Sequence, residues 1–217
     1  WSIHRSTYAA KAFARVADSP HGMVFADGAL WVLAWKGNSS ADSSIVRIEL
    51  PSGKLTQSAA LGANAWDLGV GFGRVWVAHG KQISVVDQKT LAPLPDLAIT
   101  VTDSMHLAIG TNAVYITDGG SVERIDPTSG QVTHKAMLGE LVYVLQNAGE
   151  EIVAATQPGK IYRLDAATLA IKEILTPAKD AYEPADLHVA GPQLFVLTHA
   201  SLAGGANKEA GTLFVAK

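Results

Sequence analysis

Apolar and polar residues alternate along most of this chain, in short runs separated by glycine, proline, asparagine or aspartate. Alternation with a period of two predicts β-strands, because successive side chains of a strand point to opposite faces of a sheet. Long segments with the 3.6-residue period of an amphipathic helix are absent from the sequence. The pattern therefore predicts an all-β protein built from many short strands.

The predicted strands recur in a unit of roughly forty residues. Segments that read as strand, turn and strand align without gaps, and they are HGMVFADGALWV (21–32), WDLGVGFGRVWV (66–77), MHLAIGTNAVYI (105–116), YVLQNAGEEIVA (143–154) and ADLHVAGPQLFV (185–196). A third strand follows each of them, at 44–49, 82–87, 121–126, 160–165 and 212–217. All units except the last continue into a fourth strand, within 54–62, 92–100, 131–139 and 169–177.

Repeated units of four antiparallel strands are typical of β-propeller blades. A β-sandwich also has many short strands, but it does not repeat one four-strand unit. We therefore predict a single five-bladed β-propeller domain over residues 1–217, with blades at about 21–62, 63–102, 103–139, 140–177 and 178–217. Residues 9–17 (AAKAFARVA) match the fourth strands in alternation and spacing, so they are expected to complete the last blade and close the ring. The alternative is a fragment of a wider propeller.

Composition narrows the classes of function. The formal net charge is −3 and basic residues are scattered, so nothing predicts attraction to nucleic acid or to an anionic membrane. No apolar run approaches the ~20 residues of a membrane helix. Cysteine is absent, which excludes disulfides and thiolate metal sites. Because the chain begins with Trp1 rather than Met, we expect an exported protein whose signal has been removed, in the bacterial periplasm or outside the cell.

The innermost strand of each blade has two distinct faces. One face carries large apolar residues that are expected to pack between neighbouring sheets: Met23, Leu68, Leu107, Leu145 and Leu187. The other face ends in small residues that are expected to face the central axis: Ala26, Gly71, Gly110, Ala148 and Ala190. Nearer the strand start, this second face carries polar groups at Asp67, His106, Gln146, Asp186 and His188, which should converge at the mouth of the channel.

These polar groups allow more than one chemistry. Asp67, His106, Asp186 and His188 together could hold a divalent metal, since imidazole and carboxylate suit several transition ions. They could equally serve as general acids and bases, with Gln146 orienting a substrate. The simplest alternative is a channel in which they bind ordered water. The sequence contains no local metal-binding or catalytic motif that would decide between these possibilities.

Aromatic and histidine residues are expected at the same mouth. Trp35, Trp66 and Tyr143, together with His21, His79 and His199, lie at the ends of strands where loops should surround the mouth. The long loops 35–44 and 199–211 belong to blades that ring closure would make neighbours. Such residues suit stacking on a ligand or anchoring of a protein partner. Trp66 and Tyr143 have the alternative of packing between blades.

The repeats also resemble a known family. GRVWVAHGKQISVVDQKTL (73–91) and AVYITDGGSVERIDPTSGQV (113–132) are similar to bacterial propeller repeats of the YVTN type and to virginiamycin B lyase-like propellers. The resemblance runs from about residue 9 to the end and implies the propeller fold. The metal-associated His and Glu set of those lyases has no counterpart in this sequence. TDGGSVERIDP (117–127) is also similar to plant-type glutaminyl cyclases, but their acidic Gly-Glu-Gly segment is not matched by 66–68.

The sequence leads to a primary functional hypothesis and a competing one. The first is a non-catalytic, exported scaffold that binds a protein partner or a small ligand on its loop-rich face, for example as an accessory subunit of a larger complex. The competing hypothesis is an enzyme (a lyase, cyclase or hydrolase) with a metal or an acid–base site at the channel mouth.

Overall fold

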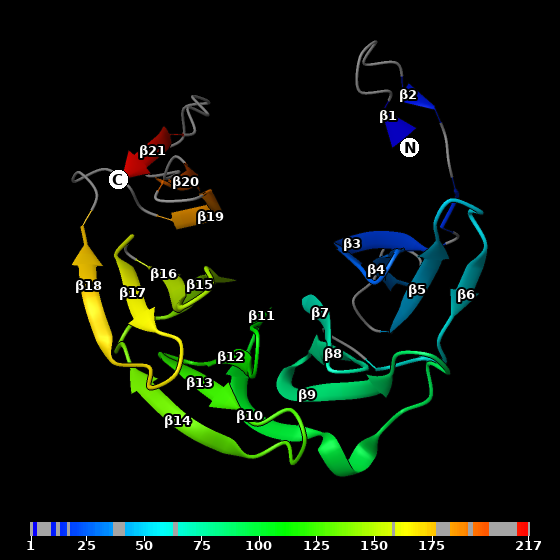
Figure 1. Cartoon of the computed structure of the whole chain (residues 1–217), viewed down its shortest axis with the longest axis horizontal. Helices are drawn as coiled ribbons and strands as arrows, with labels where there is room; N and C mark the ends of the chain where they lie inside the picture. Colours follow the sequence, from blue (N-terminus) through cyan, green and yellow to red (C-terminus); the bar gives the residue numbers. More distant parts are fainter. Residues whose placement is uncertain are drawn as a thin grey trace. The chain divides into compact units, whose positions relative to one another are not determined.

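The computed structural model divides into two compact units, residues 1–98 and residues 99–217, which are described here one after the other (Figure 1). The structure describes residues 2–3, 10–11, 14–16, 18–36, 42–62, 65–157, 159–176, 183–190, 193–199 and 212–216.

The first sheet of unit 1 contains four antiparallel strands in sequence order (blue to cyan in Figure 1). They are β3 (Ser19–Ala26), β4 (Ala29–Trp35), β5 (Ser43–Glu49) and β6 (Leu55–Gln57). The two-residue turn between β3 and β4 has positive φ at both Asp27 (49°) and Gly28 (72°). Two such residues make the tight turn whose twist matches a β-hairpin, and Asp-Gly is a favoured pair for it.

The next sheet of unit 1 repeats this arrangement over its first three strands. Its strands are β7 (Asp67–Gly71), β8 (Arg74–Ala78) and β9 (Gly80–Asp87), followed by the short 3₁₀ helix η1 (Pro95–Leu97). Phe72 and Gly73 form its first turn, again with positive φ at both positions (60° and 70°). The chain start forms a separate pair of strands, β1 (Ser2–Ile3) and β2 (Ala10–Lys11), with Ser2 opposite Lys11.

Unit 2 opens with β10 (Ile99–Ser104) and continues with a sheet in the order β11-β12-β13-β14. These strands are β11 (Leu107–Ile109), β12 (Val114–Asp118), β13 (Ser121–Ile125) and β14 (Val132–Met137). The Asp118 carboxylate accepts hydrogen bonds from the backbone N–H groups of Thr102 (2.7 Å) and Asp103 (3.1 Å). This carboxylate therefore anchors β10 to the end of β12.

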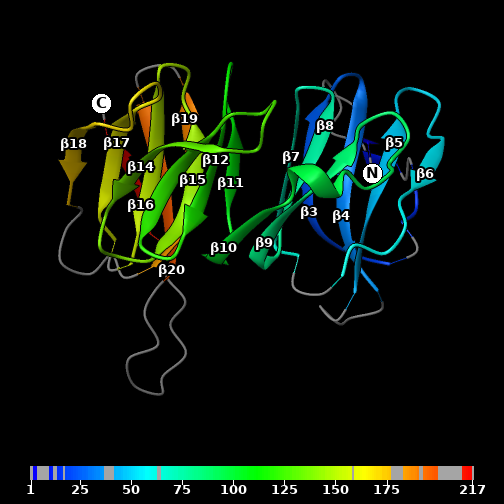
Figure 2. The same cartoon turned by 90° about the horizontal axis from the view of Figure 1, so that it is seen from below.

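Two further sheets complete unit 2, and their strands run side by side in Figure 2. One has the order β15-β16-β17-β18, with β15 (Val142–Asn147), β16 (Glu151–Thr156), β17 (Ile161–Asp165) and β18 (Ile171–Leu175). The other has the order β19-β20-β21, with β19 (Glu183–Ala190), β20 (Gln193–His199) and β21 (Thr212–Ala216). The all-β architecture and the strand order within each repeat are confirmed, and five sheets of three or four strands fit the five expected blades.

The turn between the third and fourth strands is stabilised by the same aspartate hydrogen bonds in successive repeats. Asp87, Asp126 and Asp165 each accept hydrogen bonds from two backbone N–H groups and from a Thr or Ser hydroxyl three residues later. The side-chain hydrogen bond from Thr168 is the largest of the effects that lower the pKa of Asp165 to about 2. Aspartate is used here because its short carboxylate can bond to its own backbone two and three residues on.

The core explains why the inner strands end in small residues. Trp31 and Trp76 are fully buried on β4 and β8, and their indole N–H groups donate to the carbonyls of Ala26 (3.2 Å) and Gly71 (3.4 Å). In unit 2 a Cβ added at Gly110 would lie 2.6 Å from Cε2 of Tyr115. Gly110 therefore makes room for the Tyr115 ring of the adjacent strand, and the carbonyls of Ala26 and Gly71 bind the indoles of the equivalent tryptophans.

The large apolar residues of the inner strands differ in environment. Leu68, Leu107, Leu145 and Leu187 are 5–7% exposed, as expected for packing between sheets. Met23, at the equivalent position of β3, is 68% exposed, and Phe25 on the same face is 63% exposed. Met23 is therefore exposed within unit 1, and its expected packing against the last blade depends on ring closure and stays a prediction. The two positions differ because Leu68 packs on the preceding sheet of unit 1, whereas unit 1 has no described sheet that covers the outer face of β3.

Part of the expected architecture stays a prediction. Ala10 and Lys11, expected in the outer strand of the last blade, pair with β1, while Ala14 and Val16 pack against the cluster of β4 and β5. Ring closure, and the grouping of all blades into a single domain, would join the two units and stay predictions. The long loops lie largely outside the described residues, at 37–41 and 200–211.

Candidate interaction surface

Three aromatic side chains gather at one end of the two sheets of unit 1. The His21 ring stacks on Trp35 with 3.9 Å between centroids and an interplanar angle of 18°. Trp66 meets both edge-on, at 5.3 Å from Trp35 and 5.7 Å from His21. We call these residues the aromatic cluster. The sequence placed them at one mouth, and the structure brings them into contact.

Local backbone features position the aromatic cluster. The pairing of β3 with β4 shifts register between Pro20 and Gly22, so His21 is an extra residue in its strand. A bulge of this kind re-aims a side chain at the end of a sheet. Trp35 ends β4, and its indole N–H donates to the carbonyl of Ala65 (2.7 Å). Because Ala65 immediately precedes Trp66, this hydrogen bond fastens the second sheet's leading segment to the end of β4.

The aromatic cluster is open on one side. Trp66 is 36% exposed, His21 is exposed and Trp35 is half-buried. Partial burial against the two indoles lowers the pKa of His21, which favours the uncharged form of the stacked ring. Exposed aromatic rings held rigidly by one another lose little conformational freedom on binding and can bury a large apolar area. This arrangement suits a surface that docks against another molecule.

Asp67, the first residue of β7, directly follows the aromatic cluster in the chain. Its Oδ1 accepts a hydrogen bond from the backbone N–H of Leu68 (2.8 Å), and the side chain is half-buried. A carboxylate beside exposed aromatic rings adds an acceptor for a donor of a bound molecule.

The remaining polar residues expected at the channel mouth lie in unit 2, on inner strands that are neighbours: β11 beside β15, and β15 beside β19. His106 precedes β11, and burial lowers its pKa to about 4, so it is neutral at pH 7. On β15, Oε1 of Gln146 is buried and accepts no hydrogen bond from the described residues. On β19, His188 is exposed, and the side chain of Asp186 lies outside the described residues.

The metal hypothesis stays a prediction. Within the part of the chain that the structure describes, no group of three or more His, Asp or Glu side chains lies close enough to hold a metal ion. The four expected ligands cannot be compared as a set, because Asp67 belongs to unit 1 while the other three belong to unit 2, and the side chain of Asp186 is not described.

Tyr143 is half-buried at a register shift of β15, the position that His21 occupies in β3.

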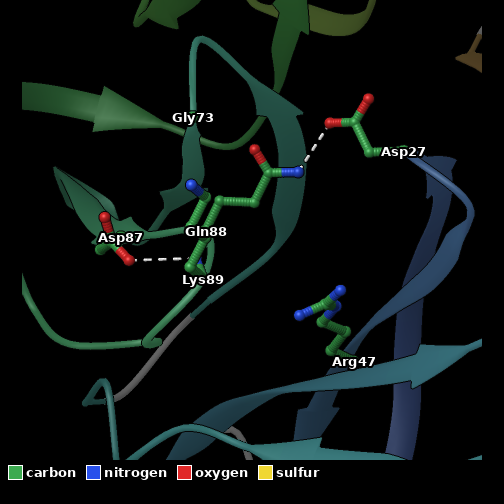
Figure 3. A pocket seen from close by; sticks show the side chains of 6 residues that line it. All are labelled: Asp27, Arg47, Gly73, Asp87, Gln88 and Lys89. Atoms are coloured by element: carbon green, nitrogen blue, oxygen red, sulfur yellow. Dashed lines mark hydrogen bonds between the residues drawn. The ribbon is translucent and has the colours of Figure 1, made fainter.

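Sequence reasoning missed a pocket at the other end of unit 1. Figure 3 shows this pocket, which has a volume of about 490 Å³ and is lined by Asp27, Arg47, Gly73, Asp87, Gln88 and Lys89. Its residues come from the two positive-φ turns and from the ends of β5 and β9. The sequence did contain a signal for this pocket. Arginine occupies the same repeat position at 47, 124 and 163, while the residues on the strands beside it differ among the repeats.

Comparison with known proteins gives the fold but not a family. No protein-family model matches the chain, and no curated protein matches it. Among solved structures, the chain is similar to the Neurospora crassa Pan2 WD40 domain (TM-score 0.68, 15% identity, covering 92% of this chain and 63% of that one). It is also similar to the β-propeller domain of Myceliophteria thermophila Cps50 (Swd1) (TM-score 0.69, 12% identity, covering 85% and 64%).

A third similar structure is BamB from Moraxella catarrhalis (TM-score 0.63, 14% identity, covering 97% of this chain and 69% of that one). The chain spans less than two thirds of the Pan2 and Cps50 domains. These likenesses support a β-propeller repeat protein, and at such identities they carry the fold alone. The finer resemblance to YVTN-type and virginiamycin B lyase-like repeats stays a prediction.

Proposed function

We propose that this protein is a non-catalytic scaffold that binds a protein partner through the aromatic cluster of His21, Trp35 and Trp66. The observation that carries the proposal is the mutual contact of these three rings, one pair stacked and Trp66 edge-on to both, at an open end of unit 1. Residues that dominate the binding energy of protein interfaces are enriched in Trp and Tyr and gather in rigid, well-packed groups. The half-buried Asp67 carboxylate beside the cluster would give such an interface an orienting acceptor.

The scaffold role agrees with the fold. Within each unit, short antiparallel strands are joined by turns that aspartate side chains hold, and groups held in this way bind with little loss of conformational entropy. No helix among the described residues is long and apolar enough to cross a membrane. As finer parts of the same proposal, the protein is exported to the periplasm or outside the cell and acts as an accessory subunit. Cell fractionation with a tag at the C-terminus tests the export.

The binding proposal is tested with two matched variants. Trp66 and Phe72 are similarly exposed (36% and 38%) and lie at opposite ends of β7. The protein is purified with a tag from its source organism, a stoichiometric partner is identified, and the affinity of that partner is measured by calorimetry. We expect Trp66→Ala to weaken binding by about thirtyfold, the effect of losing about 2 kcal/mol at an interface hot spot. Phe72→Ala should leave the affinity unchanged.

Two results would contradict the proposal. One is a protein that purifies without any stoichiometric partner under conditions that preserve native complexes. The other is equal affinity of the partner for the Trp66→Ala variant and the wild type, which would place the interface away from the aromatic cluster. Thermal unfolding of both variants serves as the control that each has kept its fold.

A further inference from the structure

The pocket beside Arg47 has a lining of both charges, and its carboxylates are already engaged. Asp27 Oδ2 accepts a hydrogen bond from the Gln88 amide (2.7 Å), and Asp87 Oδ1 holds the turn that follows β9 (Figure 3). The Lys89 side chain is exposed, and its charge interacts with Asp87, whose pKa it helps to lower after the larger effect of the hydrogen bonds from Thr90. Among the lining residues, Arg47 is the one with a buried N–H that lacks a partner among the described residues.

Arg47 is held in place without being hydrogen-bonded. Its guanidinium lies over the ring of the buried Trp31, 5.4 Å from the centroid, in a cation–π contact. Its Nε is buried and has no hydrogen-bond partner among the described residues. Its ion pair with Glu49 is long, at 3.9 Å. A buried guanidinium N–H without a partner is costly, because the group has lost water without gaining an acceptor.

The chain itself shows what this arginine position binds when it is satisfied. Arg163 occupies the same position of the fourth repeat, where its Nε donates to Glu151 (2.8 Å) and its Nη1 to Glu173 (3.1 Å). Pairing across the strands places Ala29 and Thr56 of the first repeat at the positions of these two glutamates. The first repeat has therefore kept the arginine and lost both carboxylates.

The third repeat shows an intermediate arrangement. Arg124 donates to the hydroxyl of Thr133 (2.9 Å) and to the side-chain oxygen of Asn112 (3.3 Å). Nε of Arg124 is buried without a partner as well, but its terminal nitrogens are bonded, whereas Arg47, which borders the pocket of Figure 3, makes no hydrogen bond among the described residues.

We propose that the pocket formed by Asp27, Arg47, Gly73, Asp87, Gln88 and Lys89 binds a carboxylate of an acidic peptide segment. The carboxylate would take the place that Glu151 and Glu173 hold around Arg163. Arg47 would donate to it from a pre-oriented planar group, and Lys89 would add a second positive charge. The site lies at the opposite ends of the strands from the aromatic cluster and takes a different ligand chemistry. Its test therefore does not depend on the aromatic cluster.

Nuclear magnetic resonance of the arginine Nε–Hε groups tests the proposal on the intact chain. The protein is labelled with ¹⁵N and titrated with the peptide acetyl-Glu-Glu-Glu-amide, with acetate and with inorganic phosphate. We expect the Arg47 signal to shift and to saturate with a dissociation constant at or below about 1 mM for the peptide. The Arg163 signal should stay in place, because its glutamates already satisfy it, and so it is an internal control in the same spectrum.

Two variants locate the site. Arg47→Gln should weaken peptide binding by about ten- to a hundredfold, the effect of losing a charge-assisted hydrogen bond. Lys89→Met removes an exposed charge whose interaction with Asp87 is the smallest of the effects on that carboxylate's pKa, and it leaves Arg47 on Trp31, so it keeps the test valid if Arg47→Gln perturbs that packing. It should weaken binding by about two- to fivefold and make binding less sensitive to salt.

The proposal is overturned if the Arg47 signal does not move with the peptide, or if it moves no more than that of Arg163. Tighter binding of phosphate than of the peptide would also overturn it, because the pocket would then recognise a phosphoryl group instead of a carboxylate. If acetate and the peptide bound with equal affinity, the pocket would recognise a carboxylate alone, and the proposal of a peptide as its occupant would be wrong.

Discussion

The contrast between Leu68 and Met23 makes a quantitative prediction about stability. The two residues occupy the same repeat position on β7 and β3, yet Leu68 is 6% exposed and Met23 is 68% exposed. Leu68 packs with the buried cluster of unit 1, and its Cδ2 lies 3.3 Å from the Cβ that Gly22 would carry. Truncation to alanine should therefore have very different consequences at the two positions.

The size of the difference follows from burial. Leu68→Ala removes three buried carbons at about 0.8 kcal/mol each and leaves a cavity, so we expect a loss of about 3 kcal/mol in the free energy of unfolding. Met23→Ala removes a side chain that is mostly in water, so we expect a loss below about 0.5 kcal/mol. For a chain of this size, 3 kcal/mol lowers the melting temperature by about 6–12 °C.

Urea unfolding monitored by tryptophan fluorescence, with thermal unfolding as a second measurement, tests both values. Equal slopes against urea for the two variants and the wild type would show that the comparison is of stability alone. If Met23→Ala destabilises the protein as much as Leu68→Ala, Met23 is buried in solution. In that case the description of the outer face of β3 as exposed is wrong, and another sheet covers this face.

Other side chains give further tests. Gly110→Ala should destabilise the protein by about 1–3 kcal/mol, because the new methyl group would meet the Tyr115 ring at 2.6 Å, and the added substitution Tyr115→Leu should recover part of that loss. Lys135→Met should lower the free energy of unfolding by about 1–2 kcal/mol, because it leaves the 6%-exposed Glu123 without its ion-pair partner at 2.6 Å. Chemical unfolding of the double variant Lys135→Met/Glu123→Met should show that part of this stability is recovered. Since folding lowers the pKa of Asp165 from its ordinary 3.8 to about 2, its contribution is present above pH 4 and disappears as the pH falls toward 2. The stabilities of wild type and Asp165→Asn should therefore differ at pH 6 and converge near pH 2, and a constant difference across this range would contradict the assignment.

The strands and turns could be predicted from the sequence because they depend on local chemistry. Alternation located each inner strand, and Asp27 with Gly28 marked a turn that the structure closes with positive φ at both residues. The repeat alignment also gave the register, since the buried rings of Trp31 and Trp76 lie at equivalent positions.

The sequence could not distinguish Met23 from Leu68, because a side chain's own strand does not encode the presence of a sheet beside it. Contact of His21 with Trp35 was not predictable either, although both were expected at one mouth. It depends on the bulge in β3, which changes where one residue points. The pocket at Arg47 was not predicted, because it depends on the absence of carboxylates at Ala29 and Thr56, on the two strands that pair with the strand of Arg47.

The bulged position at the start of the inner strands has an evolutionary consequence. Register shifts at this position occur in β3, β15 and β19, so the residue there lies outside the paired ladder. Across the five repeats it is histidine, tryptophan, methionine, tyrosine and alanine, whereas the residue two places later is always leucine or methionine. One position can thus vary freely while its near neighbour keeps the packing of the sheet. Duplicated blades of this kind can diversify what they display one residue at a time, without having to re-establish a fold.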